Sequence, residues 1–282
     1  MAPEMIELFK KGMELNYSAK YRRGNIIHLP DAGELIITGD LHGHRRNFEK
    51  IVTFADLENN PQRHVVFQEI LHGGPEDGQG GCLSFKLLFD AIRYQLEFGD
   101  QVHLILGNHD TAIVSDIDIM KMGREMTRAM QAAMKRQFGG EYVSVYLALT
   151  EYLVSQPLAV RCANRIWASH SLPPDSDVDS FDTTVFGRHS QVSDMTRPNP
   201  AYQLTWGRRH SEETLSTLAK MLDADLFILG HQPQPAGWAR VADNTVIIAS
   251  DHNHGAVISF DLEKSYTIDE LIRCILPLAA IK

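Results

Sequence analysis

The feature that most constrains the fold of this chain is a series of short apolar runs that alternate with segments of helical periodicity. The apolar runs lie at residues 35–38, 65–67, 103–106, 166–169, 226–229 and 246–249. Between them, apolar side chains recur every three or four residues, as in segments 48–55 and 85–96. This alternation predicts βαβ units and a parallel sheet. A further run at 256–258 follows closely, which predicts antiparallel pairing near the end of the chain.

The rest of the chain predicts mostly helix and loop. Residues 117–152 are expected to be helical, and their methionines to pack in the core. A polar loop reaches to about residue 200, and a helix follows with Ser211 as its N-cap. No Pro/Gly/Ser-rich linker divides the 282 residues. We therefore expect a single domain over residues 1–282, with its core at about 33–261, an N-terminal helix and a helical insertion at about 117–152.

Composition excludes some classes of function and partner. The chain is 44% hydrophobic and 22% charged, as in ordinary globular proteins, and its formal net charge of -9 argues against a nucleic-acid polymer as partner. The three cysteines are far apart and form no CxxC pair, which suits a reducing compartment. No apolar run reaches membrane-spanning length and the N-terminus does not resemble a signal peptide, so we expect a cytoplasmic protein without a membrane partner.

Residue types that bind metals follow every one of these apolar runs. In chain order they are Asp40 and His42, Glu69, Asn108 and His109, His170, His231, and His252. The carboxyl ends of parallel strands meet at one edge of a sheet, so these side chains are expected to lie together. Mixed oxygen and nitrogen ligands suit Mn²⁺, Fe and Zn²⁺. Two ions about 3.5–4 Å apart would hold a hydroxide between them and bind the attacking and leaving oxygens of a phosphate ester.

Four motifs in order carry a family resemblance. Residues 39–43 match GDxHG, residues 107–109 match GNH, and segments 156–170 and 230–231 resemble the segments that carry two further ligand histidines. The sequence, over about residues 33–261, therefore resembles the calcineurin-like metallophosphoesterase superfamily, especially its phosphoprotein phosphatase branch. The resemblance implies an α/β fold in which mixed sheets form a layered αββα sandwich. It also implies two divalent metal ions as cofactors.

The resemblance also implies roles for individual residues. Asp40 and His42 would bind one metal ion. The other ion would be bound by Asn108, His170 and His231. His109 would be a catalytic residue, protonating the leaving-group oxygen as a general acid.

The second motif departs from the family pattern. The family has GDxxDRG where this chain has Gln-Glu-Ile-Leu-His-Gly-Gly at residues 68–74. Glu69 takes the place of the bridging Asp and can still bridge two ions, whereas the amide of Gln68 would bridge poorly. His72 replaces the second Asp, so we expect a catalytic role in which it hydrogen-bonds a phosphate oxygen or His109. Gly73 replaces the phosphate-binding Arg.

Another group must therefore bind the phosphate. Arg208 is the first candidate for this catalytic and substrate-binding role, because a guanidinium binds phosphate oxygens in a bidentate fork. The alternatives are Arg209, beside it in sequence, and the pair Arg45 and Arg46 beside the first motif. His252 is expected to line the substrate-binding site. His254 is expected to serve packing instead.

The main functional hypothesis is a phosphomonoesterase that acts on a phosphoprotein or on a phosphorylated small molecule. Two alternatives remain. One is a phosphodiesterase or dinucleoside polyphosphate hydrolase on the same scaffold, because pocket loops rather than the metals decide between mono- and diesters. The other is a non-catalytic metal-binding relative. Against the latter, all six ligand positions retain residues able to bind metal.

Overall fold

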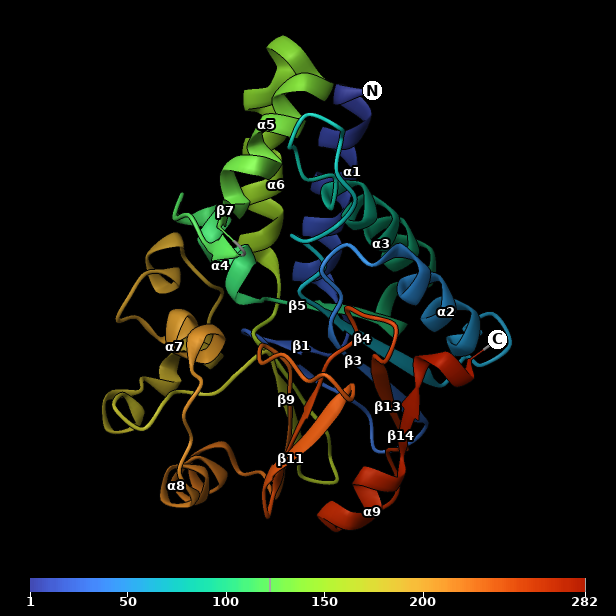
Figure 1. Ribbon diagram of the computed structural model, residues 1–282. Coiled ribbons are helices and arrows are strands. Elements are labelled where there is room, and N and C mark those ends of the chain that lie inside the picture. Colours follow the sequence, from blue (N-terminus) through green and yellow to red (C-terminus); the bar gives the residue numbers. More distant parts are fainter. Residues whose placement is uncertain (122, 282) are drawn as a thin grey trace.

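Two β-sheets pack face to face between layers of helices in the computed structural model, which describes residues 1–121 and 123–281 (Figure 1). The five-stranded sheet has the order β14-β13-β3-β4-β5, and the seven-stranded sheet the order β1-β2-β8-β9-β10-β12-β11. The strands are β1 (Arg22–Arg23), β2 (Ile26–His28), β3 (Glu34–Asp40), β4 (Arg63–Gln68), β5 (Val102–Ile105), β6 (Met120–Lys121), β7 (Arg124–Glu125), β8 (Ala159–Arg161), β9 (Ile166–Ser169), β10 (Leu226–Leu229), β11 (Trp238–Ala242), β12 (Thr245–Ile248), β13 (Ala256–Asp261) and β14 (Ile275–Pro277). The α-helices are α1 (Ala2–Ser18), α2 (Arg45–Ala55), α3 (Phe85–Phe98), α4 (Asn108–Val114), α5 (Met126–Phe138), α6 (Tyr142–Ser155), α7 (Pro200–Trp206), α8 (Glu212–Leu222) and α9 (Ile268–Arg273).

Both sheets combine parallel and antiparallel pairs. β3, β4 and β5 are parallel to one another, and so are β9, β10 and β12. β13 pairs antiparallel with β3 and β14, and β11 pairs antiparallel with β12. The predicted mixed αββα fold and the antiparallel pairing near the end of the chain are therefore confirmed. Within the described residues, no helix is both long and apolar enough to cross a lipid bilayer.

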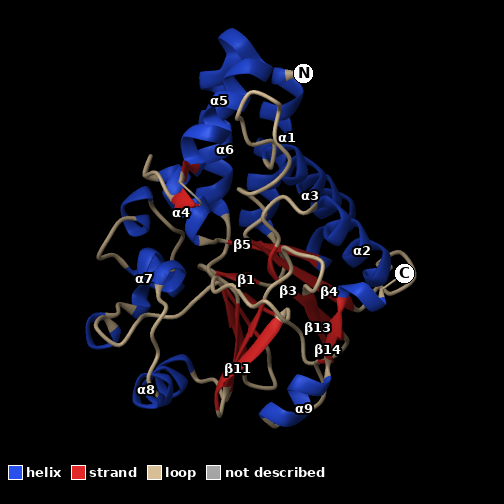
Figure 2. Cartoon of the chain, in the orientation of Figure 1, coloured by secondary structure: helices blue, strands red, loops and turns tan. Residues whose placement is uncertain are grey.

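Alternation along the strands divides the core between the two faces of a sheet. On β4, Val65 and Phe67 pack against a cluster that includes side chains of α1, α2 and α3. Val66, between them, belongs instead to the cluster that also holds Ile166 and Ile228 of the other sheet. Successive side chains of a strand point to opposite faces, so a continuous apolar run is what a strand buried on both faces requires. Figure 2 shows the strands enclosed by helices.

The helix α8 covers the outer face of the seven-stranded sheet. As predicted, Ser211 is its N-cap, and the Ser211 hydroxyl accepts the backbone N–H of Thr214 at 3.2 Å. Leu215 and Leu218 pack in the same cluster as Phe227 of β10. The helix thereby buries the apolar stripe that the sequence pattern indicated.

The expectation of helix throughout residues 117–152 was wrong at its beginning. β6 and β7 form an antiparallel hairpin there, and α5 begins only at Met126. The reason is local: the Asp118 carboxylate accepts the backbone N–H of Thr127 at 3.1 Å, which satisfies a donor in the first turn of α5. Met130 and Met134 are buried as predicted, whereas Met120 is 62% exposed. Met122 lies outside the described residues, and the single-domain organisation stays a prediction.

Candidate metal centre

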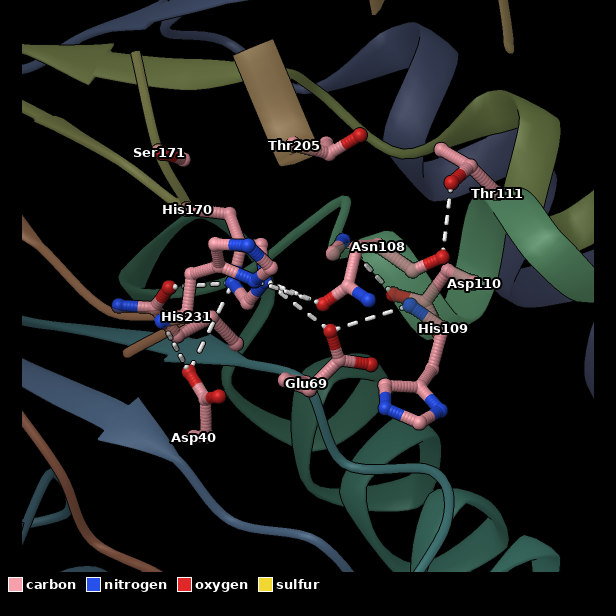
Figure 3. Close-up of polar contacts among 12 residues, drawn as sticks. Asp40, Glu69, Asn108, His109, Asp110, Thr111, His170, Ser171, Thr205 and His231 are labelled. Atoms are coloured by element: carbon pink, nitrogen blue, oxygen red, sulfur yellow. Dashed lines mark hydrogen bonds and ion pairs between the residues drawn. The ribbon is translucent and has the colours of Figure 1, made fainter. Parts of the chain in front are cut away.

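The ends of five strands bring the predicted ligands together at one edge of the two sheets. Asp40 ends β3, and Glu69 follows the last residue of β4. Asn108 begins α4 just beyond β5, while His170 follows β9 directly. His231 stands two residues beyond β10. Figure 3 shows these five side chains pointing toward one another.

His170 is the centre of this group and has no exposed surface. Its Nε2 lies 3.0 Å from Asn108 Oδ1 and 3.1 Å from Glu69 Oε2. Asn108 Oδ1 is also 2.9 Å from His231 Nδ1. The three residues predicted to share one metal ion are thus in direct mutual contact, with Glu69 beside them.

Asp40 and His42 lie together next to this group. Asp40 Oδ1 accepts the backbone N–H of His231 at 2.8 Å, and Asp40 Oδ2 is 3.6 Å from His42 Nε2. The other imidazole nitrogen, His42 Nδ1, is 3.2 Å from the carbonyl oxygen of Leu71. A carbonyl only accepts, so His42 Nδ1 carries a proton, and Nε2 is the ring nitrogen that faces the Asp40 carboxylate.

Four residues of these turns adopt left-handed backbone conformations. The φ angles are +43° at His42, +47° at Glu69, +66° at His72 and +67° at His231. Residues other than glycine rarely adopt this backbone conformation, which costs on the order of 1–2 kcal/mol per residue. Such turns persist only where tertiary contacts stabilise them, and here they direct side chains from the strand ends into the site.

Two motif glycines leave room for the ligand side chains. A Cβ on Gly107 would lie 2.4 Å from Glu69 Oε2, and a Cβ on Gly230 would lie 2.6 Å from Asp40 Oδ1. Gly107 has an extended backbone with φ of -107°, which any residue can adopt. Glycine is therefore required at residue 107 by the nearby carboxylate rather than by the backbone conformation.

His109 lies between two other imidazoles. Its ring centroid is 4.3 Å from that of the fully buried His72 and 5.2 Å from that of His42. The backbone N–H of His109 donates to Glu69 Oε2 at 3.2 Å. A cavity of about 230 Å³ is lined by Asp40, His42, Asn108, Ile119, Met120, His109, Trp206, Arg208, His231, Gln232, Pro233, Ala249 and Asp251. The predicted general acid therefore borders the same cavity as four of the predicted ligands, Asp40, His42, Asn108 and His231.

The charges in the site shift the pKa values of its buried groups. Burial lowers the pKa of His170, but the carboxylates of Asp40 and Glu69 outweigh it, so that the pKa is raised. Burial and the neighbouring His170 hold the pKa of His231 well below its usual value. Burial, followed by the charge of Glu69, raises the pKa of Asp110 well above its usual value. The sequence analysis overlooked Asp110, although it directly follows the GNH motif; its carboxylate accepts the Gly107 N–H at 2.9 Å.

The four candidate arginines differ in position. Arg208 lines the cavity, and within residues 1–121 and 123–281 it forms no ion pair. Arg45 pairs with Asp90 at 2.6 Å, and neither Arg46 nor Arg209 lines that cavity.

Both ring nitrogens of His252, the predicted substrate-binding residue, form hydrogen bonds with backbone groups. Its Nε2 donates to the carbonyl of Gln234 at 2.9 Å, and its Nδ1 accepts the N–H of His254 at 3.1 Å. The neighbouring Asp251, which the sequence analysis passed over, lines the cavity instead. The role of His252 in substrate binding stays a prediction. His254 is exposed rather than packed in the core.

The donor chemistry of the site suits a divalent cation. In the described part of the chain, no group of three or more His, Cys, Asp and Glu side chains is arranged so that it could hold a metal ion. The set gathered here includes the amide oxygen of Asn108, and its donor atoms contact one another. Within residues 1–121 and 123–281, Glu69 Oε1 is buried and makes no hydrogen bond. Buried polar atoms are costly without a partner, and a divalent cation bound by oxygen and nitrogen would supply one.

The fold and this set of residues define a phosphoesterase. The model of the calcineurin-like phosphoesterase family matches residues 34–235, and the chain belongs to this family. A protein serine/threonine phosphatase from Saccharomyces cerevisiae has a similar structure, with a TM-score of 0.67 and 13% identity over 92% of this chain and 82% of that one. A cold-active protein-tyrosine phosphatase from Shewanella sp. is also similar, with a TM-score of 0.60 and 14% identity over 89% of this chain and 80% of that one.

A sequence relative covers a shorter segment. A probable serine/threonine-protein phosphatase from Encephalitozoon cuniculi is 24% identical over 155 residues. These residues are 55% of this chain and 30% of that protein. The family prediction is therefore confirmed, and the relatives with solved structures confirm the fold.

Proposed function

We propose that this chain is a phosphomonoesterase that depends on two divalent metal ions. One observation carries the proposal: Asn108 Oδ1 and Glu69 Oε2 both lie within 3.1 Å of His170 Nε2. Oxygen and nitrogen donors about 3 Å apart are spaced as neighbouring ligands of an ion with bonds of about 2.0–2.2 Å. Mn²⁺, Fe and Zn²⁺ all accept this mixed set.

The residues divide between two ions as the family resemblance implies. Asp40 and His42 would hold one ion, and Asn108, His170 and His231 the other. Glu69 would contact both, because one of its carboxylate oxygens faces His170 while the other has no hydrogen-bond partner among the described residues. Bound ions would supply Lewis acidity toward the phosphate and a water of lowered pKa.

The chain's own side chains would orient the substrate. Arg208 borders the cavity beside the ligands, and its guanidinium would bind phosphate oxygens in place of the arginine missing at Gly73. His109 borders the same cavity and would give its proton to the leaving-group oxygen. His72 packs against the His109 ring and would hold its orientation.

Room for a leaving group supports a monoester substrate of some size. A second cavity of about 650 Å³ adjoins the first and shares His42 and Asp251 with it. The leaving group would lie there, between residues 73–76 and the segment from Arg124 to Met126. The similar proteins named above are serine/threonine and tyrosine phosphatases, which favours a phosphoprotein or a phosphorylated small molecule as substrate.

Rates on two synthetic esters test this function. Chelator-treated protein is assayed with p-nitrophenyl phosphate and bis-p-nitrophenyl phosphate, with Mn²⁺, Fe²⁺ or Zn²⁺ and without metal. We expect a metal-dependent rate that is at least tenfold higher on the monoester. A faster diester reaction would favour a phosphodiesterase, and no reaction on either ester with any of the metals would favour a non-catalytic protein.

A further inference from the structure

Gln68 stands where the GDxxDRG motif has glycine, and its side chain lies against a predicted metal ligand. It is the last residue of β4 and only 1% exposed. The amide nitrogen Nε2 donates to the carbonyl oxygen of Thr38 at 2.7 Å. The amide oxygen Oε1 lies 3.0 Å from His170 Nδ1. A side chain that the motif lacks thus joins β3 to the imidazole after β9.

The first of these contacts determines the direction of the second. A carbonyl oxygen can only accept a hydrogen bond, so the group of Gln68 that faces Thr38 must be the NH₂. The oxygen of the amide is then the group that faces His170. Because an amide oxygen only accepts, His170 Nδ1 must carry the proton that it donates.

The packing around Gln68 keeps the amide in this place. A Cβ on Gly230 would lie 2.6 Å from Gln68 Oε1, so the turn at Gly230 approaches the amide as closely as a residue without a side chain allows. Gln68 has no counterpart in the sequence pattern of the motif. Its insertion between the sheets is therefore a property of this chain.

We propose that Gln68 is a positioning residue whose amide oxygen accepts the Nδ1–H of His170 and thereby directs Nε2 toward Asn108 and Glu69. The use of Nε2 as a metal ligand rests on the proposed function, whereas the hydrogen bond between Gln68 and Nδ1 does not. An imidazole that ligates metal through one nitrogen commonly donates from the other, and loss of that partner typically costs about 10–100-fold in metal affinity.

The hydrogen bond from His170 Nδ1 is measured on metal-free protein. The ¹⁵N shift of Nδ1 shows whether this nitrogen carries a proton, and the exchange rate of that proton with water shows whether it is held in a hydrogen bond. We expect a slowly exchanging proton on His170 Nδ1 in the wild type. In Gln68→Leu the acceptor is removed, so this proton should exchange faster. Gln68→Glu, which retains an oxygen at this position, should restore slow exchange.

Metal affinity is the second measurement. Titration with Mn²⁺ should show about 10–100-fold weaker binding for Gln68→Leu. Gln95→Leu is the matched control, because Gln95 is an equally buried amide on α3 that bonds Asn16 at 2.9 Å and is not among the residues of the site. This control should bind Mn²⁺ as the wild type does.

The outcomes separate this inference from the proposed function. A wild-type His170 without a proton on Nδ1, or a Gln68→Leu variant with wild-type affinity, would overturn the role of Gln68. The melting temperature could fall equally in Gln68→Leu and Gln95→Leu while the Mn²⁺ affinity stays unchanged. That result would show that Gln68 contributes only to packing. Wild-type protein that binds no Mn²⁺ yet shows Nδ1–H would contradict the metal function and leave the positioning of His170 supported.

Discussion

Shortening Glu69 by one methylene should separate metal binding from folding stability. Glu69 is 1% exposed, and its Oε2 contacts His170 at 3.1 Å and the His109 N–H at 3.2 Å. Glu69→Asp withdraws the carboxylate by about 1.5 Å, the length of one carbon–carbon bond. Both contacts would then exceed hydrogen-bond distance, and a carboxylate so far back would reach neither metal ion without movement of the turn.

The effect on stability without metal should be small, because two changes oppose each other. Loss of the contacts with the His109 N–H and with His170 Nε2 costs about 0.5–1.5 kcal/mol each, or somewhat more for a charged acceptor. The backbone of Glu69 is left-handed, with φ of +47°, and Asp occupies that region more readily than Glu. Part of a strain on the order of 1–2 kcal/mol is thereby relieved. We expect the free energy of unfolding to fall by less than about 2 kcal/mol.

Metal affinity and activity should fall much further. Residues that hydrogen-bond a metal ligand contribute about 10–100-fold to metal affinity. Loss of a ligand itself should therefore lower metal affinity more than about 100-fold. Mn²⁺ titration of chelator-treated protein, urea unfolding with chelator present, and kcat/KM on phenyl phosphate measure the three quantities. Glu69→Gln keeps the length but loses the charge, and it should be impaired more than Glu69→Asp. Wild-type metal stoichiometry and rate in both variants would refute contact between Glu69 and the metals.

Three further predictions concern groups around this centre. His109→Ala should lower kcat on phenyl phosphate about 10²–10⁴-fold and much less on p-nitrophenyl phosphate, since only the poor leaving group needs a proton; equal losses would assign His109 to positioning. Arg208→Ala should raise KM about tenfold or more, as expected for loss of a charge-assisted hydrogen bond, whereas Arg209→Ala should leave it unchanged; the reverse order would move the phosphate-binding role to Arg209. Burial and the neighbouring imidazole of His64 lower the pKa of His103 to about 3. In the unfolded chain His103 takes up a proton below about pH 6.5, whereas in the folded protein it does so only near pH 3. The free energy of unfolding should therefore decrease between these pH values by up to about 1.4 kcal/mol per pH unit. Urea unfolding at pH 7 and pH 5 should show a smaller difference for His103→Leu, and an equal difference would exclude this origin.

Several properties of the site were predictable from the sequence because they are local. The position of Asp40 at the end of β3 and of His170 directly after β9 follows from the strand pattern and the residue type found there. A parallel sheet brings such strand ends to one edge, so residue type and order are enough to place a ligand near the centre. The hairpin of β6 and β7 was missed, since the hydrogen bond from the Thr127 N–H to Asp118 joins residues nine apart, and no periodicity reveals it.

Other properties depend on contacts between distant segments, which only the folded chain creates. Gln68 and His170 are 102 residues apart, and nothing in either sequence neighbourhood shows that an amide meets an imidazole. The need for glycine at residue 107 comes from Glu69, whose carboxylate occupies the space of a Cβ. The sequence thus determined which groups stand at the strand ends, since each lies beside its own strand. Tertiary packing decided the hydrogen-bond partners, the free space and the orientation of those groups, because these depend on atoms that sheet formation brings within about 3 Å of one another.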